Sequence, residues 1–234
     1  FDVFAGGADA WLPVLRAIAI ITMLVGNLLA IAQTNVKRML AYSGIGHAGY
    51  LLITIVCVGL RYAGHSGTKA SMLALTANVF YLLAYSLALG GAFAVLCYLT
   101  TSDRDVQSLS DLRGLAAVNP VIGYSMVLFM LSLAGIPATA GFIAKWQVFN
   151  SILTGGDIVL SIVMALASAL GVYYYLRVVW YIVFDDQGSA GARPADASAR
   201  SAGGAGAAIA ICAICTIGLG LFPGAISAFL TVVR

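Results

Sequence analysis

The chain has 234 residues, of which 62% are hydrophobic and 9% are charged, and its mean hydropathy is +1.00. A soluble globular domain carries about 25% charged residues, so this composition excludes one and indicates a multi-pass helical membrane protein. The net charge of +3 is small and the lysines and arginines are scattered, which argues against nucleic acid as a partner.

The apolar runs predict an all-α, polytopic membrane bundle of about six transmembrane helices. A bilayer core takes about 20 helical residues, and each run is long enough to cross it. The predicted spans are about 11–32, 36–60, 70–99, 118–154, 157–184 and 207–234, with the fourth discontinuous. Residues 185–206 are rich in Gly, Ala and Ser and are predicted to form a flexible linker before the final helix.

The second predicted span carries Lys37 and Arg38 in its first turn and His47 deeper in the helix. We interpret Arg38 as an interfacial anchor. Lys37 has two interpretations, as an anchor or as an inward-facing group at the cytoplasmic end of a proton route. His47 either passes a proton near neutral pH or holds a neighbouring helix by a hydrogen bond. Small residues in 41–50 favour close helix approach, and Ser43 shares the face of His47.

The connection at residues 100–115 is the most polar ordered part of the sequence. Ser110 is expected there to cap a short surface helix outside the membrane.

The fourth span, residues 118–154, is too long for one straight helix and is interrupted by Gly135, Pro137 and Gly141. Proline lacks an N–H, and glycine adopts backbone angles that other residues avoid. We therefore expect two half-helices, about 120–133 and 142–153, joined by unwound backbone near the bilayer midplane. Backbone groups freed at that depth must be buried in protein or line a wet cavity.

Lys145 follows this break by about one turn. An ammonium at mid-membrane costs at least a few kcal/mol, so such residues usually face the bundle interior and belong to an ion or proton path. We expect Lys145 to be the central proton carrier. The alternative is a lysine that snorkels to the interface, beside Trp146 as an interfacial aromatic. All nine acidic residues are aspartates in or beside predicted loops, so no carboxylate within these spans neutralises Lys145.

The sequence indicates no metal, cofactor or redox centre on this chain. Rossmann glycines, iron–sulfur cysteine spacing and haem motifs are all missing, and no second ligand lies near His47. Cys212 and Cys215 lack a second ligand pair and are interpreted as buried small hydrophobes. Residues 1–10 lack the charged start of a signal peptide and an initiating Met, so the chain is expected to be the later part of a longer protein.

Basic residues predict that both termini lie on the outer side of the membrane. Six basic residues fall in loops opposite the termini: Lys37, Arg38, Arg104, Arg113, Arg193 and Arg200. Arg61, Lys69 and Arg234 lie on the side of the termini.

Three blocks together resemble one family: 33–43 continuing through 47–50, 131–137 continuing through 141–145, and 171–177. The first two are similar to the antiporter-like subunits of respiratory complex I and of the related multisubunit cation/proton antiporters. The third, with three tyrosines before Leu-Arg, is most similar to the subunit N family of bacterial NADH-quinone oxidoreductases.

This resemblance implies a fold of fourteen helices with two inverted five-helix repeats. Residues 1–184 would form the second repeat, and residues 207–234 the closing helix. It also implies that Lys145 matches the central lysine of the broken helix, and that Lys37 and His47 match polar positions on the repeat's second helix. The family's glutamate and other central lysines belong to the first half, which this chain lacks.

The implied function is proton translocation in the membrane arm of an NADH-quinone oxidoreductase, coupled to NADH oxidation elsewhere in the complex. The implied location is the bacterial inner membrane, and the implied partners are the bilayer and other membrane-arm subunits, especially neighbouring antiporter-like subunits. Two alternatives stay open. One is a subunit that exchanges sodium for protons; the other is a structural subunit with an inert Lys145.

Overall fold

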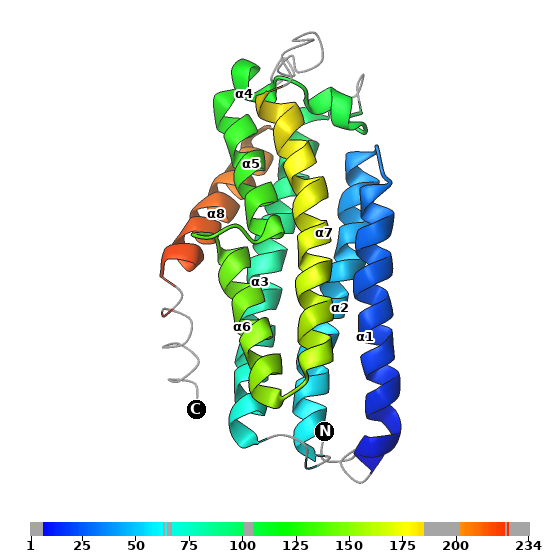
Figure 1. Ribbon diagram of the computed structural model, residues 1–234. Helices are drawn as coiled ribbons and strands as arrows, with labels where there is room; N and C mark the ends of the chain where they lie inside the picture. The colour runs from blue at the N-terminus through cyan, green and yellow to red at the C-terminus, as the bar shows by residue number, and fades with distance from the viewer. Residues whose placement is uncertain are drawn as a thin grey trace.

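The computed structural model describes residues 7–62, 64, 67–100, 105–184, 202–222 and 224. Every regular element in these ranges is helical, apart from an isolated β-bridge between Asn35 and Ser108. Five of the described helices are long and apolar enough to cross a membrane, and a sixth span is divided into two shorter helices. The predicted all-α polytopic bundle is therefore confirmed (Figure 1).

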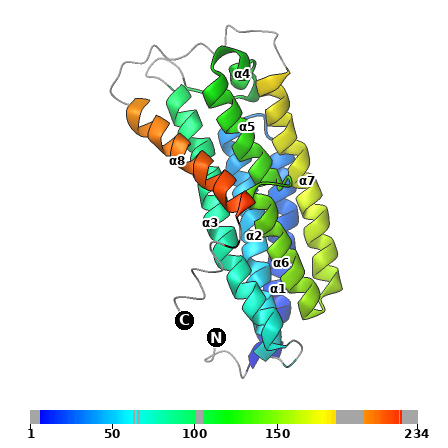
Figure 2. The ribbon, with the colours of Figure 1, turned by 90° about the vertical axis from the view of Figure 1, so that its left-hand side faces the viewer.

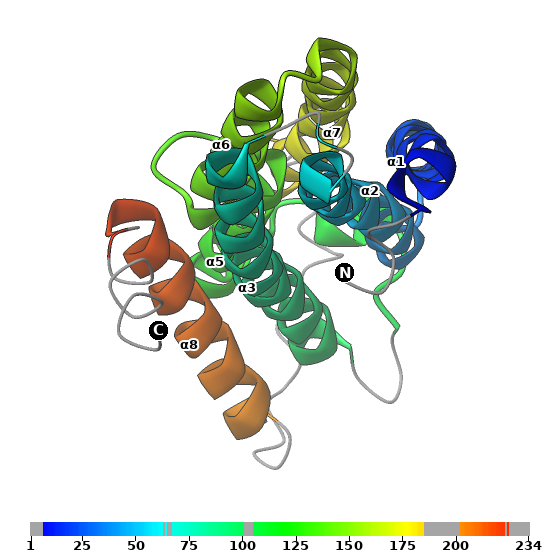
Figure 3. The same cartoon turned by 90° about the horizontal axis from the view of Figure 1, so that it is seen from below.

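Three long helices begin the bundle: α1 (Ala8–Ile31), α2 (Val36–Tyr62) and α3 (Thr68–Leu99). The first two pack side by side along their length (Figures 1 and 3). Gly26 of α1 lies so close to α2 that a Cβ there would be 2.4 Å from the nitrogen of Gly46. This close approach is what the small residues of 41–50 predict.

The polar connection folds into a 3-10 helix, η2 (Leu109–Leu112), and a short helix, α4 (Leu115–Val118). Ser108 precedes η2, and its N–H donates to Oδ2 of Asp111 at 2.8 Å. The expectation that Ser110 is the cap is wrong by two positions. A capping box needs an acidic or amide side chain three residues after the cap, and Asp111 meets that spacing from Ser108.

The broken span consists of α5 (Pro120–Ala134) and α6 (Ala140–Gly155). Asn119 caps α5, and Pro120 occupies its first turn, where a missing N–H costs little. Asp157 caps α7 (Ile158–Val183), which packs against α1 and α5. The break lies about midway along the bundle (Figure 1).

The last described helix, α8 (Ala202–Leu221), crosses the outer face of α3 at a steep angle and ends beside the α5–α6 break (Figures 2 and 3). It begins five residues before the predicted position 207, so residues 202–206 are helix rather than linker. Glycine has a low helix propensity, so the glycine-rich composition favoured a loop. Packing of α8 along α3 overrides that propensity. The rest of the predicted linker, 185–201, and residues 225–234 of the predicted final helix lie outside the described residues.

Two hydrophobic clusters fill the interior, and the break separates them. Leu133 and Ala134, at the end of α5, belong to the cluster nearer the polar connection. Ala140 and Ala144, at the start of α6, belong to the cluster nearer the N-terminus. The unwound backbone therefore lies where the two parts of the core meet.

Candidate functional site

The end of α5 is built around Gly135, which adopts a left-handed conformation with φ of +83°. Its N–H donates to the carbonyl oxygens of Leu131 and Ser132, both at 3.0 Å, and the N–H of Ile136 also reaches Leu131 O at 3.0 Å. This is the Schellman pattern that ends helices at glycine. Pro137 follows on the exposed side of the turn and cannot continue the helix.

The start of α6 is bonded back to α5. Thr139 caps the helix: its Oγ1 accepts from Phe142 N at 3.4 Å and donates to Ile136 O at 2.7 Å. Gly141 N donates to Ser132 Oγ at 3.2 Å, and a Cβ on Gly141 would lie 1.8 Å from Ser132 O. The two half-helices approach so closely that no side chain fits at position 141. Several of the backbone groups freed by the break, among them the N–H groups of Gly135, Ile136 and Gly141, are thus bonded within the protein.

Lys145 is buried, with 9% of its surface exposed, and its ammonium returns to the end of α5. Nζ donates to the carbonyl oxygens of Leu133 and Ala134, both at 2.9 Å, and lies 5.8 Å from the centre of the Tyr50 ring. Trp146, by contrast, points outward and is 57% exposed. The interpretation of Lys145 as a lysine that snorkels to the interface is therefore wrong. Its amine turns inward and bonds to the end of α5.

The carbonyls that hold Lys145 carry the partial negative charge of a helix C-terminus. Lys145 lies near the positive N-terminal end of α6, but its amine reaches across to the negative end of α5. Arg16–Asp157 and Lys37–Asp105 form ion pairs, whereas the Lys145 amine is held by the carbonyl dipoles of Leu133 and Ala134. A dipole fixes the amine in place without the full attraction of an opposite charge.

His47 is 4% exposed and lies at the centre of a cluster of tyrosines from two other helices, α3 and α7. Its Nδ1 is 2.6 Å from the hydroxyl of Tyr81, and its Nε2 is 3.1 Å from the hydroxyl of Tyr175. The ring stacks on Tyr85 with centroids 4.5 Å apart. A neutral imidazole donates from one nitrogen and accepts at the other, so one phenol donates to His47 and the other accepts from it.

A small cavity joins His47 to Lys145. Its volume is about 10 Å³, room for about one water, and both side chains line it. The other lining residues are Tyr81, Ala84, Tyr85, Ala88, Ser132, Leu133, Gly141 and Ala144. Two of the three candidate proton-carrying residues, His47 and Lys145, therefore line one cavity.

A second, larger cavity of about 170 Å³ lies on another side of Lys145, between α6 and α7. Its lining is largely apolar and includes Phe142, Trp146, Phe149 and Met164, with Ser168 as a polar exception. The amine of Lys145 thus stands between the small cavity shared with His47 and the larger cleft between α6 and α7.

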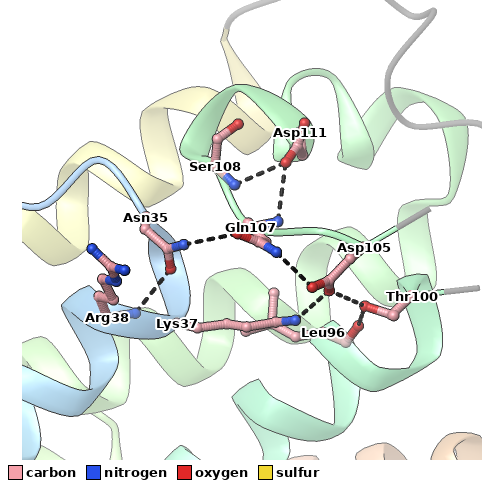
Figure 4. A network of polar contacts seen from close by, with 9 residues as sticks. All are labelled: Asn35, Lys37, Arg38, Leu96, Thr100, Asp105, Gln107, Ser108 and Asp111. Atoms are coloured by element: carbon pink, nitrogen blue, oxygen red, sulfur yellow. Dashed lines mark hydrogen bonds and ion pairs between the residues drawn. The ribbon is translucent and has the colours of Figure 1, made fainter.

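Lys37 lies apart from this site. It forms an ion pair with Asp105 in the connection after α3, and both side chains are partly exposed, 37% and 47% respectively (Figure 4). Gln107 Nε2 donates to the same carboxylate at 2.7 Å. The inward-facing interpretation of Lys37 is wrong, because a carboxylate 68 residues later in the chain draws its side chain to the end of the bundle. Arg38 is exposed there, consistent with an anchor.

Sequence reasoning missed the tyrosines around His47. Tyr81 and Tyr85 are spaced i, i+4 within an apolar span, and Tyr173, Tyr174 and Tyr175 are consecutive, which could have marked both helices as polar-faced. Tyr174 extends the cluster by donating to Asn27 Oδ1 at 2.9 Å.

Arg177 follows the three consecutive tyrosines of α7 by two residues. In the structure its Nη1 donates to Ile31 O at 3.1 Å and its Nη2 to Gln33 O at 2.5 Å. It thus ties α7 to the C-terminal end of α1, a position that cations favour.

Within the described residues, no group of three or more His, Cys, Asp or Glu side chains is arranged to hold a metal ion. Cys57 is a buried hydrophobe, whereas Cys212 and Cys215 are half-buried on α8 and unbridged.

Comparison with known proteins gives the family. The family model described as NADH:quinone oxidoreductase/Mrp antiporter, TM, matches residues 1–171. The NADH-quinone oxidoreductase subunit N of Bdellovibrio bacteriovorus is 40% identical over 184 residues, covering 79% of this chain and 36% of that protein. The subunit N of Salinibacter ruber is 42% identical over 229 residues, covering 96% of this chain and 44% of that protein. The chain thus spans less than half the length of these relatives.

Solved structures agree. A chain of respiratory complex I from Thermus thermophilus with bound aureothin is 33% identical, with a TM-score of 0.71 over 91% of this chain and 44% of that one. A chain of the Mrp complex from Dietzia sp. has the same fold, with a TM-score of 0.73 at 22% identity, over 96% of this chain and 47% of that one. The resemblance of the three sequence blocks is confirmed: the chain belongs to the NADH:quinone oxidoreductase/Mrp antiporter transmembrane family.

Proposed function

We propose that this chain moves protons in the membrane arm of an NADH-quinone oxidoreductase, with Lys145 as the carrier. The observation that carries the proposal is the placement of the Lys145 amine. It is buried at a helix break, bonded to two backbone carbonyls, and separated from His47 by a cavity with room for about one water. Buried ionisable groups at broken membrane helices are costly, and they persist where they serve transport.

In this mechanism the proton reaches Lys145 from the His47 side. The imidazole bonds to one phenol at each nitrogen, so a proton taken up at one nitrogen is matched by release from the other. Tyr81, which bonds to His47 Nδ1 and lines the shared cavity, would pass the proton to a water there, and that water would protonate the neutral Lys145 amine. We place uptake on the side of Lys37 and Arg38, which the distribution of basic residues assigns to the cytoplasm.

Release follows from a change in the charge or shape around the amine. The ammonium is held by the negative end of α5, so a shift of that end relative to α6 weakens its stabilisation. The cleft between α6 and α7 then offers an outlet once water enters past Ser168. While that cleft is dry, its apolar lining keeps the proton on the carrier.

NADH oxidation and quinone reduction belong to other subunits in this proposal, and coupling is electrostatic and conformational. The partners are neighbouring membrane-arm subunits in a bacterial inner membrane. Support comes from the relatives, which are named as subunit N of NADH-quinone oxidoreductases.

A second candidate is a subunit that exchanges sodium for protons, favoured by the shared fold of the Mrp chain. Vesicles containing the full-length protein in its complex separate the two candidates. NADH-driven acidification that is independent of sodium supports the proposal, and strict sodium dependence supports the antiporter.

The test of the carrier is Lys145→Met in the full-length protein within its complex, measured as protons moved per NADH oxidised. Lys69→Met is the matched control, because Lys69 is exposed in the first turn of α3. We expect Lys145→Met to lower the yield and Lys69→Met to leave it unchanged. An unchanged yield in Lys145→Met would refute the proposal.

A further inference from the structure

The C-terminal part of α8 rests directly on the break. A Cβ on Gly220 would lie 2.6 Å from the carbonyl oxygen of Ala138, 2.7 Å from the carbonyl carbon of Thr139 and 2.8 Å from the nitrogen of Ala140. All three are backbone atoms, which cannot swing aside as a flexible side chain can. Position 220 therefore admits no side chain while the break keeps this conformation.

The inward face of α8 is seated along its length. Ile209, Thr216 and Gly220 are buried and spaced by seven and four residues, so they lie on one face of the helix. The opposite face exposes Ile211, Ile214 and Ile217. Helix α8 thus covers the break, and its buried face packs against α3, α5 and α6.

The segment that Gly220 touches is strained. Ala138 has a φ of +71°, the only described residue other than glycine with a positive φ. Such a conformation is unfavourable for a residue with a Cβ and persists only where surrounding structure imposes it. The close backbone contact with α8 supplies part of that surrounding structure.

The strained segment also sets the position of Lys145. It connects the end of α5, whose Leu133 and Ala134 carbonyls hold the amine, to the start of α6, which carries Lys145 in its second turn. Gly141 is wedged against Ser132 on the other side of the same turn. A displacement of 138–140 therefore changes where the amine stands relative to those carbonyls.

From these contacts we infer that Gly220 is a positioning residue for Lys145: by letting α8 close on residues 138–140, it holds the helix break in the conformation that the carrier needs. The inference rests on the proposed function for its transport consequence. Its structural part concerns only the conformation of the break.

The test compares Gly220→Ala with Gly218→Ala in the full-length protein in its complex. Gly218 is the matched control, because a Cβ there meets nothing within 4 Å. We expect hydrogen exchange in peptides covering 133–145 to become roughly tenfold faster in Gly220→Ala and to stay unchanged in Gly218→Ala. We also expect the pH dependence of the proton yield to shift in Gly220→Ala alone.

A second variant keeps the test decisive if Gly220→Ala fails to assemble. Glycine tolerates positive φ and lets the 138–139 peptide rotate, so Ala138→Gly combined with Gly220→Ala should restore assembly and most of the proton yield. Without that recovery, the clash is not at the break and the inference is overturned. It is equally overturned if assembled Gly220→Ala matches Gly218→Ala in exchange and in pH profile.

The two proposals fail separately. If Lys145→Met pumps normally while exchange responds to Gly220→Ala, the proposed function fails and the positioning of the break stands. If Lys145→Met loses pumping while Gly220→Ala behaves as Gly218→Ala does, only the role of Gly220 is lost.

Discussion

The polar side chains on the two sides of Lys145 are used in different ways. On the side of His47, they bond to one another across helices: His47 to Tyr81 and Tyr175, and Tyr174 to Asn27. Toward the N-terminal end, four buried hydroxyl groups bond to carbonyls of their own helix or its cap, those of Thr54, Ser71, Ser151 and Ser161.

This difference indicates which side of Lys145 can relay a proton. Bonds between helices form a connected path, whereas a hydroxyl satisfied by its own helix offers no onward step. Asn78, which donates to Thr54, is a cross-helix contact on the second side, within a core of residues such as Ile53, Val148 and Leu160. Lys145 thus lies at the boundary between a connected polar region and an apolar one.

The largest effect is expected where the two regions meet. Gly141→Ala places a Cβ 1.8 Å from Ser132 O, so the two half-helices must separate. We expect a loss of about 3 kcal/mol or more in stability, at the upper end of overpacking effects. The measurement is the thermal midpoint and the amount of assembled complex. Gly155→Ala, in open space at the other end of α6, is the control; equal stability of the two variants would contradict the close packing.

Removing a hydroxyl from the polar region should slow transport without unfolding the protein. Tyr175→Phe deletes the partner of His47 Nε2, and losing one buried hydrogen bond of about 1 kcal/mol corresponds to a roughly three- to tenfold slower proton movement. Tyr173→Phe is the control, because the Tyr173 side chain is exposed on the surface of the same helix. The readout is the initial rate of NADH-driven acidification, and identical rates in both variants would remove the tyrosines from the path.

A polar side chain placed in the apolar cleft should let protons leak back across the membrane. Met164 is buried and lines the cleft that reaches Lys145, so Met164→Gln brings a polar group to the dry side at a cost of about 1–3 kcal/mol. We expect NADH oxidation to continue while the proton gradient decays faster. Met164→Leu keeps the cleft apolar and should hold the gradient. A gradient that decays at the same rate in both variants would show that the cleft is not the barrier.

The smallest effect is expected at the exposed end. The hydrogen bond from Lys37 lowers the pKa of the Asp105 carboxyl, and Gln107 adds to the shift. A lowered folded-state pKa contributes stability above the carboxyl's unfolded pKa, and that contribution is lost as pH falls through the folded value. Asp105→Asn should therefore lower the thermal midpoint slightly at neutral pH and not at strongly acidic pH. Proton yield should stay unchanged, and a lost yield would return Lys37 to the path.

The sequence was sufficient for features encoded locally. A long apolar run with Gly135, Pro137 and Gly141 predicted the break, because backbone preferences act within a few residues. Lys145 was singled out by the cost of a charge within that run. The all-α class followed from composition and length in the same way.

Features created by distant contacts could not be read from the sequence. His47 meets Tyr175 across 128 residues, and Lys37 meets Asp105 across 68. The start of α8 at Ala202 depends on packing against α3, where glycine-rich sequence alone favours a loop. The sequence therefore singled out Lys145 but not the tyrosines that bond to His47 across helices beside it.

The most direct test of the central claim is a structure of the whole complex at a resolution that shows ordered water. The account predicts a water in the cavity between His47 and Lys145, within hydrogen-bonding distance of the Lys145 amine, and a dry cleft beside Met164. A dry cavity on the His47 side, with water reaching Lys145 only through the cleft, would contradict it.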